Sequence, residues 1–300
     1  MVLERFASIQ YFIQEGVNSI LRRHTNHISR ATSVRAIPAG LSLCLILLAA
    51  GPAHAQNTLT DAQSAFYSAR YEEAAALMLD RCADGDFEAC ELRTSALHFE
   101  VKRAIGDAKD KDQALKECAK CQGLIDAFLK DTKRGQEAAR AVLSATPGDE
   151  TALFFLGKLD LNYVWLHLGT LGRKTGWNEY WEARKSIEAV LKNNPQHVRA
   201  KVARAWIDYI VDTRMPRGTR WVLGGGNKKR ALTALDEAAK ANSDFYTAAE
   251  AKFALWDIQV REKKFSEAVV VARQLAKDFP SNVDLPKFLQ EHDPEFKAGE

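Results

Sequence analysis

The sequence lacks an apolar run long enough to cross a membrane. Its longest uncharged apolar core, Leu41–Ala50, has 10 residues, whereas a membrane-spanning helix needs about 20. The chain also lacks a net charge once its first 55 residues are set aside. Those residues carry five arginines against Glu4 and Glu15, which leaves 37 basic and 37 acidic residues from Gln56 onward. The overall basic bias that accompanies many nucleic-acid partners is therefore absent.

Catalytic and nucleotide-binding motifs are also lacking. The chain has no H-E-x-x-H and no G-x-S-x-G, and after residue 55 its four histidines are widely spread in the sequence. The stretch RMPRGTRWVLGGGNKKRA (214–231) has three adjacent glycines, but no Ser or Thr follows Lys228 as a P-loop requires. The dinucleotide fingerprint fails as well, because Lys229 stands where its last glycine belongs. We expect no cofactor and no catalysis; an enzyme on this scaffold is the least favoured alternative.

A secretory signal accounts for the uneven charge of the N-terminus. Residues 36–56 contain no Lys, Arg, Asp or Glu, and an apolar core there is followed by Ala53-His54-Ala55. This order of segments predicts cleavage after Ala55 and export of the remainder, into the periplasm of a Gram-negative bacterium or beyond. The 34 residues before Arg35 are long for a charged leader region, so a translation start near Val34 is an alternative.

Cysteine is scarce, and its distribution agrees with export. Cys44 would leave with the signal, and four cysteines remain: Cys82, Cys90, Cys118 and Cys121. An oxidising compartment favours disulfides. Four cysteines permit three pairings, and closeness in sequence favours Cys82–Cys90 and Cys118–Cys121. A four-cysteine zinc site is the alternative, because the ligand type fits although the first spacing is long.

Nearly every segment from Thr60 onward has helical periodicity, and no alternating β-branched hairpin signal is present. Small residues recur 12 positions before a proline or serine: Gly135 before Pro147, Ala183 before Pro195, Ala231 before Ser243, and Ala268 before Pro280. An earlier copy is indicated at Ala74. This pattern resembles the tetratricopeptide (TPR) repeat, in which two antiparallel helices, A and B, pair and a small residue lies early in helix B. The resemblance implies an all-α, right-handed solenoid.

The spacing between repeats predicts two enlarged connections between helices A and B. The steps from Gly135 to Ala183 and from Ala183 to Ala231 are each 48 residues, against about 34 in a standard repeat. We expect residues 56–130 to hold the cysteines and one TPR-like hairpin, 131–282 to hold the regular repeats, and 283–300 to hold a capping helix or tail. Residues 84–130 fit the repeat register poorly.

The second enlarged connection includes the glycine-rich stretch. Asn227 is predicted to cap a helix that begins there, with the glycines serving the turn before it. If both connections lie between helices A and B, stacking of the repeats places them on one edge. The predicted site for an anionic partner consists of cations and aromatic residues on this edge: Arg173, Lys174, Arg214, Arg217, Arg220, Lys228, Lys229 and Arg230, with Trp177, Tyr180, Trp181 and Trp221.

The segment 152–172 is apolar nearly all round and is predicted to be a helix buried on more than one side. Lys158, Asp160 and His167 interrupt it, and His167 is expected to be a hydrogen-bonded core residue.

The favoured function is an exported scaffold that binds a protein or peptide partner in the cell envelope on its concave face and on this edge. A second resemblance offers an alternative. GGGNKKRALTALDEA is similar to the start of helix B in the TPR partner subunits of TRAP transporters, although Gly226-Asn227 stands where an acid is expected. That resemblance implies an oligomeric ring and binding of a small organic acid. Neither interpretation includes nucleic acid or, after cleavage, a membrane span, and the oligomeric state is left open.

Overall fold

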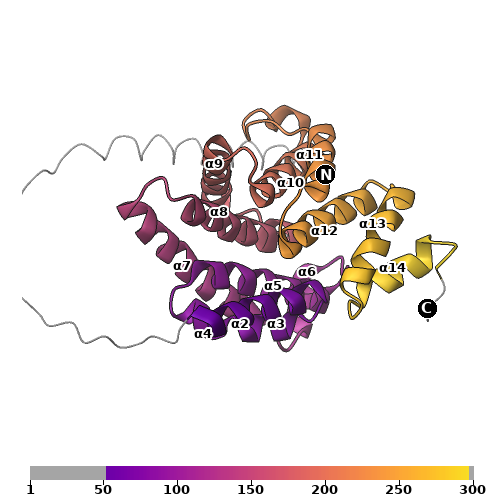
Figure 1. The fold of residues 1–300 in the computed structure, drawn as a ribbon, viewed down its shortest axis with the longest axis horizontal. Helices are drawn as coiled ribbons and strands as arrows, with labels where there is room; N and C mark the ends of the chain where they lie inside the picture. Colours follow the sequence, from indigo (N-terminus) through magenta and orange to yellow (C-terminus); the bar gives the residue numbers. More distant parts are fainter. Residues whose placement is uncertain (1–51, 297–300) are drawn as a thin grey trace, which may run out of the picture. The chain divides into compact units, whose positions relative to one another are not determined.

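The computed structural model describes residues 52–296, and these are helical throughout apart from short connections (Figure 1). The described region comprises α2 (Pro52–Tyr67), α3 (Tyr71–Leu77), α4 (Leu79–Ala83), α5 (Phe87–Ile105), α6 (Lys111–Glu117), α7 (Cys121–Ala145), α8 (Glu150–Val164), α9 (Trp177–Asn193), α10 (Val198–Arg214), α11 (Lys228–Lys240), α12 (Phe245–Arg261), α13 (Phe265–Asp278) and α14 (Asp284–His292). A π-helical segment, Trp165–Thr170, extends α8, and a single 3-10 turn, Arg217–Thr219, precedes α11.

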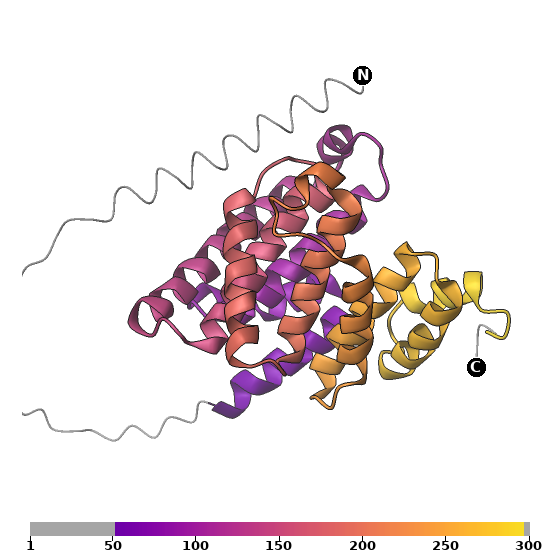
Figure 2. The same cartoon turned by 90° about the horizontal axis from the view of Figure 1, so that it is seen from above.

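These helices form a TPR-like solenoid of five hairpins. Helix A is followed by helix B in the pairs α2 and α3, α5 and α7, α8 and α9, α10 and α11, and α12 and α13, and each hairpin packs on the next. The view from above shows the later hairpins in order, from magenta through orange to yellow (Figure 2). The helix α14 lies where a capping helix was expected and buries Leu285, Phe288 and Leu289.

Side-chain caps set the starts of several A helices. Asp86 accepts a hydrogen bond from the Ala89 amide at the start of α5, and Asp149 accepts one from the Ala152 amide at the start of α8. Asp244 caps α12 in the same way. A carboxylate there satisfies an amide that has no partner within the helix and opposes the positive end of the helix dipole.

The predicted small positions lie at close helix contacts. Ala74, Ala183, Ala231 and Ala268 are fully buried, and Gly157 on α8 faces Ala183 and Ile187 of α9. A Cβ atom on Gly157 would lie 3.0 Å from the Ile187 side chain and 3.3 Å from the Ala183 carbonyl oxygen. The two helices therefore approach closely because Gly157 has no side chain and Ala183 has only a methyl group.

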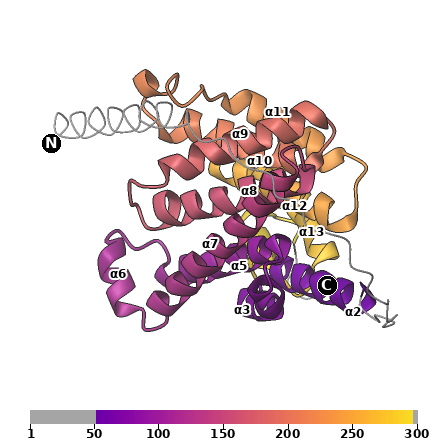
Figure 3. The same cartoon turned by 90° about the vertical axis from the view of Figure 1, so that its left-hand side faces the viewer.

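Both predicted enlarged connections are present, and a third exists. The first two span 165–176 and 215–227, whereas only three residues, 262–264, link α12 to α13. The third spans 106–120 and carries α6 between α5 and α7 (Figure 3). Repeat spacing did not reveal it because Gly135, used as the early small residue of helix B, lies in the middle of the 25-residue α7. The expected boundary between residues 130 and 131 likewise falls inside α7.

The first hairpin contacts the last repeat. The ring of Tyr67 stacks on Phe253 at 5.4 Å and on Tyr246 at 6.1 Å between centroids. The Asn282 side chain donates a 2.7 Å hydrogen bond to the Tyr67 carbonyl oxygen. Arg103 of α5 also lies 3.3 Å from the Asp284 carboxylate. The inner faces of the A helices are thereby enclosed between the two ends of the repeat array.

The four cysteines form two local disulfides. Cys82 pairs with Cys90 and Cys118 with Cys121, the pairing that closeness in sequence favours. Within residues 52–296, no group of three or more His, Cys, Asp or Glu side chains is placed to hold a metal ion.

The predicted signal region lies mostly outside the described residues, and cleavage after Ala55 would cut within the first turn of α2. No helix among the described residues has the length and apolar content of a membrane span.

Candidate binding sites

Three glycines shape the enlarged connection 215–227. Gly224 and Gly225 adopt φ angles of 75° and 73°, in the left-handed region that favours glycine. A Cβ atom on Gly226 would lie 2.4 Å from the Asp212 backbone nitrogen, so only glycine fits between the connection and α10. Asn227 accepts a 2.8 Å hydrogen bond from the Arg230 amide and caps α11. The prediction that this stretch serves turn geometry and a helix cap is confirmed.

Side chains of α9 hold the enlarged connection 215–227 in place. The Tyr180 hydroxyl donates to the Leu223 carbonyl oxygen at 2.8 Å, and Arg184 donates to the carbonyl oxygens of Leu223 and Gly224 at 2.7 and 2.9 Å. Between the connections lies an apolar cavity of about 20 Å³, large enough for about one water molecule. The two connections therefore form one edge of the repeat array, here called the connection surface and comprising 165–176, 214–227 and the first turns of α9 and α11.

The structure divides the eight predicted cations of this surface into two groups. Three are held by carboxylates: Arg220 pairs with Asp212, Lys228 with Glu262, and Arg230 with Asp208. Five are exposed and form no ion pair within residues 52–296: Arg173, Lys174, Arg214, Arg217 and Lys229. Asp212 is close to these cations in the sequence, and folding also brings Asp208 and Glu262 to them from α10 and the end of α12.

The aromatic residues of the predicted site are also divided. Trp221 is 77% exposed, whereas Tyr180 is 8% exposed and Trp177 and Trp181 pack partly against the core cluster around Ile187. Tyr180 is therefore a buried anchor for the connection and not a surface contact. Of the four predicted aromatics, Trp221 presents most of its ring to a partner.

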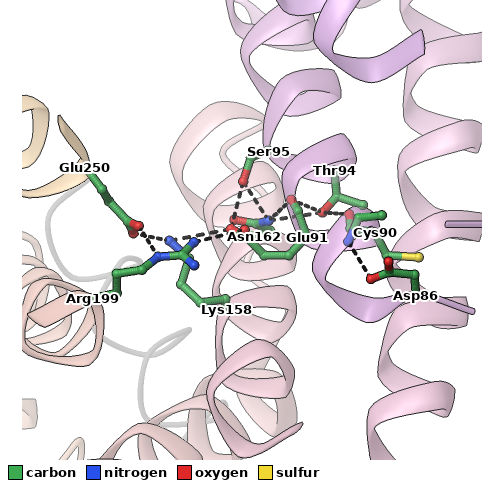
Figure 4. A network of polar contacts seen from close by, with 10 residues as sticks. Asp86, Cys90, Glu91, Thr94, Ser95, Lys158, Asn162, Arg199 and Glu250 are labelled. Carbon is green, nitrogen blue, oxygen red and sulfur yellow. Dashed lines mark hydrogen bonds and ion pairs between the residues drawn. The ribbon is translucent and has the colours of Figure 1, made fainter. Parts of the chain in front are cut away.

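A partly buried network of ion pairs joins the A helices at their inner faces (Figure 4). The Lys158 ammonium lies 2.6 Å from Glu250 and 3.5 Å from Glu91. The Arg199 guanidinium lies 2.6 Å from Glu250 and 3.7 Å from Glu91. These four residues, here called the charged network, come from α5, α8, α10 and α12, so one cluster links four successive repeats.

Neutral side chains complete the charged network. The Ser95 hydroxyl donates to Glu91 at 3.1 Å, and the Asn162 amide donates to the Glu91 carbonyl oxygen and to the hydroxyls of Thr94 and Ser95. Burial alone would raise the pKa of the Glu250 carboxyl, but Arg199 and Lys158 outweigh it and lower this pKa to about 2. Glu250 is therefore ionised at neutral pH, where it pairs with both cations of the network.

The charged network changes the interpretation of the concave face. A solenoid commonly offers its inner face to a partner, and an open concave face was expected. Here that face is occupied by ion pairs and by aromatic contacts between the first and last repeats. The inner face therefore offers a partner less free surface than the inner face of an open solenoid.

The apolar segment 152–172 was predicted to be a helix buried on more than one side, with His167 hydrogen-bonded in the core, and the structure agrees in part. Most of α8 is buried on several sides. His167 is 6% exposed and packs at 4.4 Å on the Tyr163 ring, but neither ring nitrogen has a hydrogen-bond partner among the described residues. The expected hydrogen bond of His167 is therefore not formed there.

Sequence reasoning missed most of the charged network. Lys158 was noted as an interruption in an apolar helix, but Glu91, Arg199 and Glu250 were not singled out. The sequence feature that could have indicated these residues is a charged residue within an alanine-rich stretch, as for Glu250 in AAEAKFALW. That signal does not identify partners, because Lys158 and Glu250 are 92 residues apart in the chain.

No protein-family model matches this sequence, and no match to a curated protein is found. A similar solved structure is that of TTC0263, a thermophilic TPR protein in Thermus thermophilus. The two share 15% sequence identity over 79% of this chain and 97% of that chain, with a TM-score of 0.43.

Proposed function

We propose that this chain is a non-catalytic helical-repeat scaffold that is exported to the cell envelope and binds an acidic protein or peptide segment through the connection surface. The observation that carries the proposal is Trp221, which is 77% exposed among five cations that lack ion-pair partners within residues 52–296. An exposed tryptophan supplies contact area, and exposed arginines attract carboxylates.

The anchoring of the connection surface supports the proposal. Arg184 and Tyr180 hold the carbonyl oxygens of Leu223 and Gly224, and Arg220 is held by Asp212 and by the Met215 carbonyl oxygen. A surface that is already ordered loses less conformational entropy when a partner binds. The inner face offers less room, because the charged network occupies it.

The test measures binding of a fluorescent decapeptide of glutamate to the full chain by anisotropy. We expect Arg214→Glu combined with Arg217→Glu to weaken binding at least about tenfold, because two attractive charges become repulsive. The fluorescence of Trp221 should respond to the peptide, and Trp221→Ala should weaken binding. Arg220 is left unchanged because it holds the loop through Asp212.

The matched control reverses two exposed cations elsewhere, Lys130→Glu with Lys133→Glu on α7, and should bind the peptide as the parent does. An equal loss of peptide affinity in both double variants would indicate nonspecific attraction between the peptide and the basic side chains, and would contradict the proposal. Citrate that displaces the peptide at the same residues would instead favour a small organic acid as the ligand. N-terminal sequencing of the exported chain tests the location, with Gln56 as the expected first residue.

A further inference from the structure

A second candidate site lies at the N-terminal ends of the A helices, away from the connection surface. It is a solvent-open cavity of about 410 Å³ between α5, α8, α10 and α12. That volume falls within the range of small-ligand sites. The cavity is lined by Glu88, Thr151, Phe154, Phe155, His197, Val198, Arg199, Ser243, Asp244 and Thr247. We call it the polar cavity.

The charges around the polar cavity do not balance. Arg199 lines it, but its guanidinium is already matched within the charged network by Glu91 and Glu250. Two further carboxylates line the cavity, Glu88 and Asp244, and neither forms an ion pair with the described residues. Glu88 has no hydrogen-bond partner there either and is half-buried. The cavity therefore has an excess of negative charge.

Neutral groups of the polar cavity do not offset this charge. His197 Nδ1 accepts a 3.1 Å hydrogen bond from the Ala200 amide, so the neutral ring carries its proton on Nε2. Burial lowers the pKa of His197, which keeps the ring uncharged at neutral pH. The Ser243 hydroxyl oxygen is buried without a hydrogen-bond partner among the described residues. A ligand can thus meet hydroxyl groups and carboxylates here, beside the Phe154 and Phe155 rings, whose centroids lie 4.9 and 5.4 Å from the Arg199 guanidinium.

Two carboxylates that form no ion pair with the described residues, Glu88 half-buried and Asp244 exposed, favour a positively charged occupant of the cavity. Burial raises the pKa of Glu88, and the nearby Arg199 and Arg81 charges do not offset this effect of burial. A bound cation would restore the balance. The Asp244 carboxylate accepts hydrogen bonds from the Tyr246 and Thr247 amides, which fixes its position at the cavity rim.

We propose that the polar cavity binds a primary ammonium group, contacted by the Glu88 and Asp244 carboxylates. The ammonium belongs either to a lysine side chain of a bound peptide or to a small free amine. This site is separate from the connection surface and selects the opposite charge, so failure of either proposal leaves the other standing.

The experiment titrates the isotope-labelled full chain with two ammonium probes and follows backbone amide shifts by NMR. The probes are Nα-acetyl-L-lysine N-methylamide and putrescine, and the neutral comparison is Nα-acetyl-L-norleucine N-methylamide. We expect shifts to cluster at Glu88, at 197–199 and at 243–247 with the ammonium probes only. Tighter binding of the lysine probe assigns the site to peptides, and tighter binding of putrescine assigns it to free amines.

Two variants test the carboxylates while preserving the fold. Glu88→Gln keeps the side-chain length, and Asp244→Asn keeps a residue that caps helices well. Each should weaken ammonium binding about tenfold, as expected for one close charge pair. Asp107→Asn, an exposed carboxylate on the connection between α5 and α6, should leave affinity unchanged. Equal binding of the norleucine analogue, or unchanged affinity in both cavity variants, would overturn the proposal.

Discussion

At the scale of single residues, Asp160 on α8 is the most unusual carboxyl of the described chain. It is fully buried and forms no ion pair there; one oxygen accepts a 2.7 Å hydrogen bond from Gln136, and the other has no partner. Burial, together with the nearby Glu182 charge, raises its pKa to about 9. Asp160 is therefore protonated in the folded protein at neutral pH, whereas the unfolded chain would release that proton.

This difference makes the protein less stable as pH rises. The pKa of Asp160 is higher in the folded protein than in the unfolded chain. The contribution of Asp160 to the free energy of unfolding is therefore fully present below about pH 4 and is lost as pH rises toward 9. We expect Asp160→Asn to increase the free energy of unfolding at pH 8 by on the order of 1–3 kcal/mol, because the amide does not ionise. Urea unfolding at pH 5 and pH 8 measures the effect.

The control for Asp160 is Asp126→Asn, an exposed carboxylate on α7 whose replacement should change stability little at either pH. A variant at Asp160 that is less stable than the parent at pH 8 would show that this carboxyl is ionised and stabilising in the fold.

At the scale of helices, α7 carries two glycines in contrasting environments. A Cβ atom on Gly135 would lie 2.7 Å from a Leu159 methyl carbon and 2.8 Å from the Cys90 Cβ. A Cβ atom on Gly123 would meet nothing within 4 Å. The repeat pattern correctly singled out Gly135 as a small residue, but its partners on α5 and α8 emerged only from the packed structure.

The same substitution at these two positions should have opposite effects. Gly135→Ala should destabilise the protein by about 1–3 kcal/mol, because the added methyl group overpacks the contact of α7 with α5 and α8. Gly123→Ala should stabilise it by about 0.5–1 kcal/mol, because alanine favours the helix. Thermal and urea unfolding of both variants measure the difference, and a stabilised Gly135→Ala would contradict the close packing described here.

At the scale of the whole described region, the contact between the first and last repeats distinguishes this solenoid from an open one. Helical repeats normally touch only their neighbours. Here Tyr67 of the first hairpin contacts Tyr246, Phe253 and Phe279, residues of the last repeat. These contacts, together with the charged network, couple segments far apart in the chain.

Removal of the Tyr67 ring tests this coupling. We expect Tyr67→Ala to destabilise the protein by about 3–5 kcal/mol, the usual cost of deleting a packed aromatic ring. Hydrogen exchange should become faster both in α2 and in α12–α14, because the two ends lose a shared contact. Leu79→Ala, at a residue that is 47% exposed, is the control and should leave exchange in α12–α14 unchanged. Faster exchange confined to α2 would argue against the coupling.

The sequence by itself determined the helical class, the small residues at helix contacts and the Asn227 cap, and it favoured the two local cysteine pairs. Each depends on residues within about one helical hairpin, where spacing along the chain reports spacing in space. Only the tertiary structure decided how far the repeats curve. Curvature brings Tyr67 to Asn282, 215 residues away, and places Glu91, Lys158, Arg199 and Glu250 in one cluster. Each repeat is rotated slightly relative to the one before it, and the total rotation over several repeats decides which distant residues meet. A pattern within one repeat does not reveal that total.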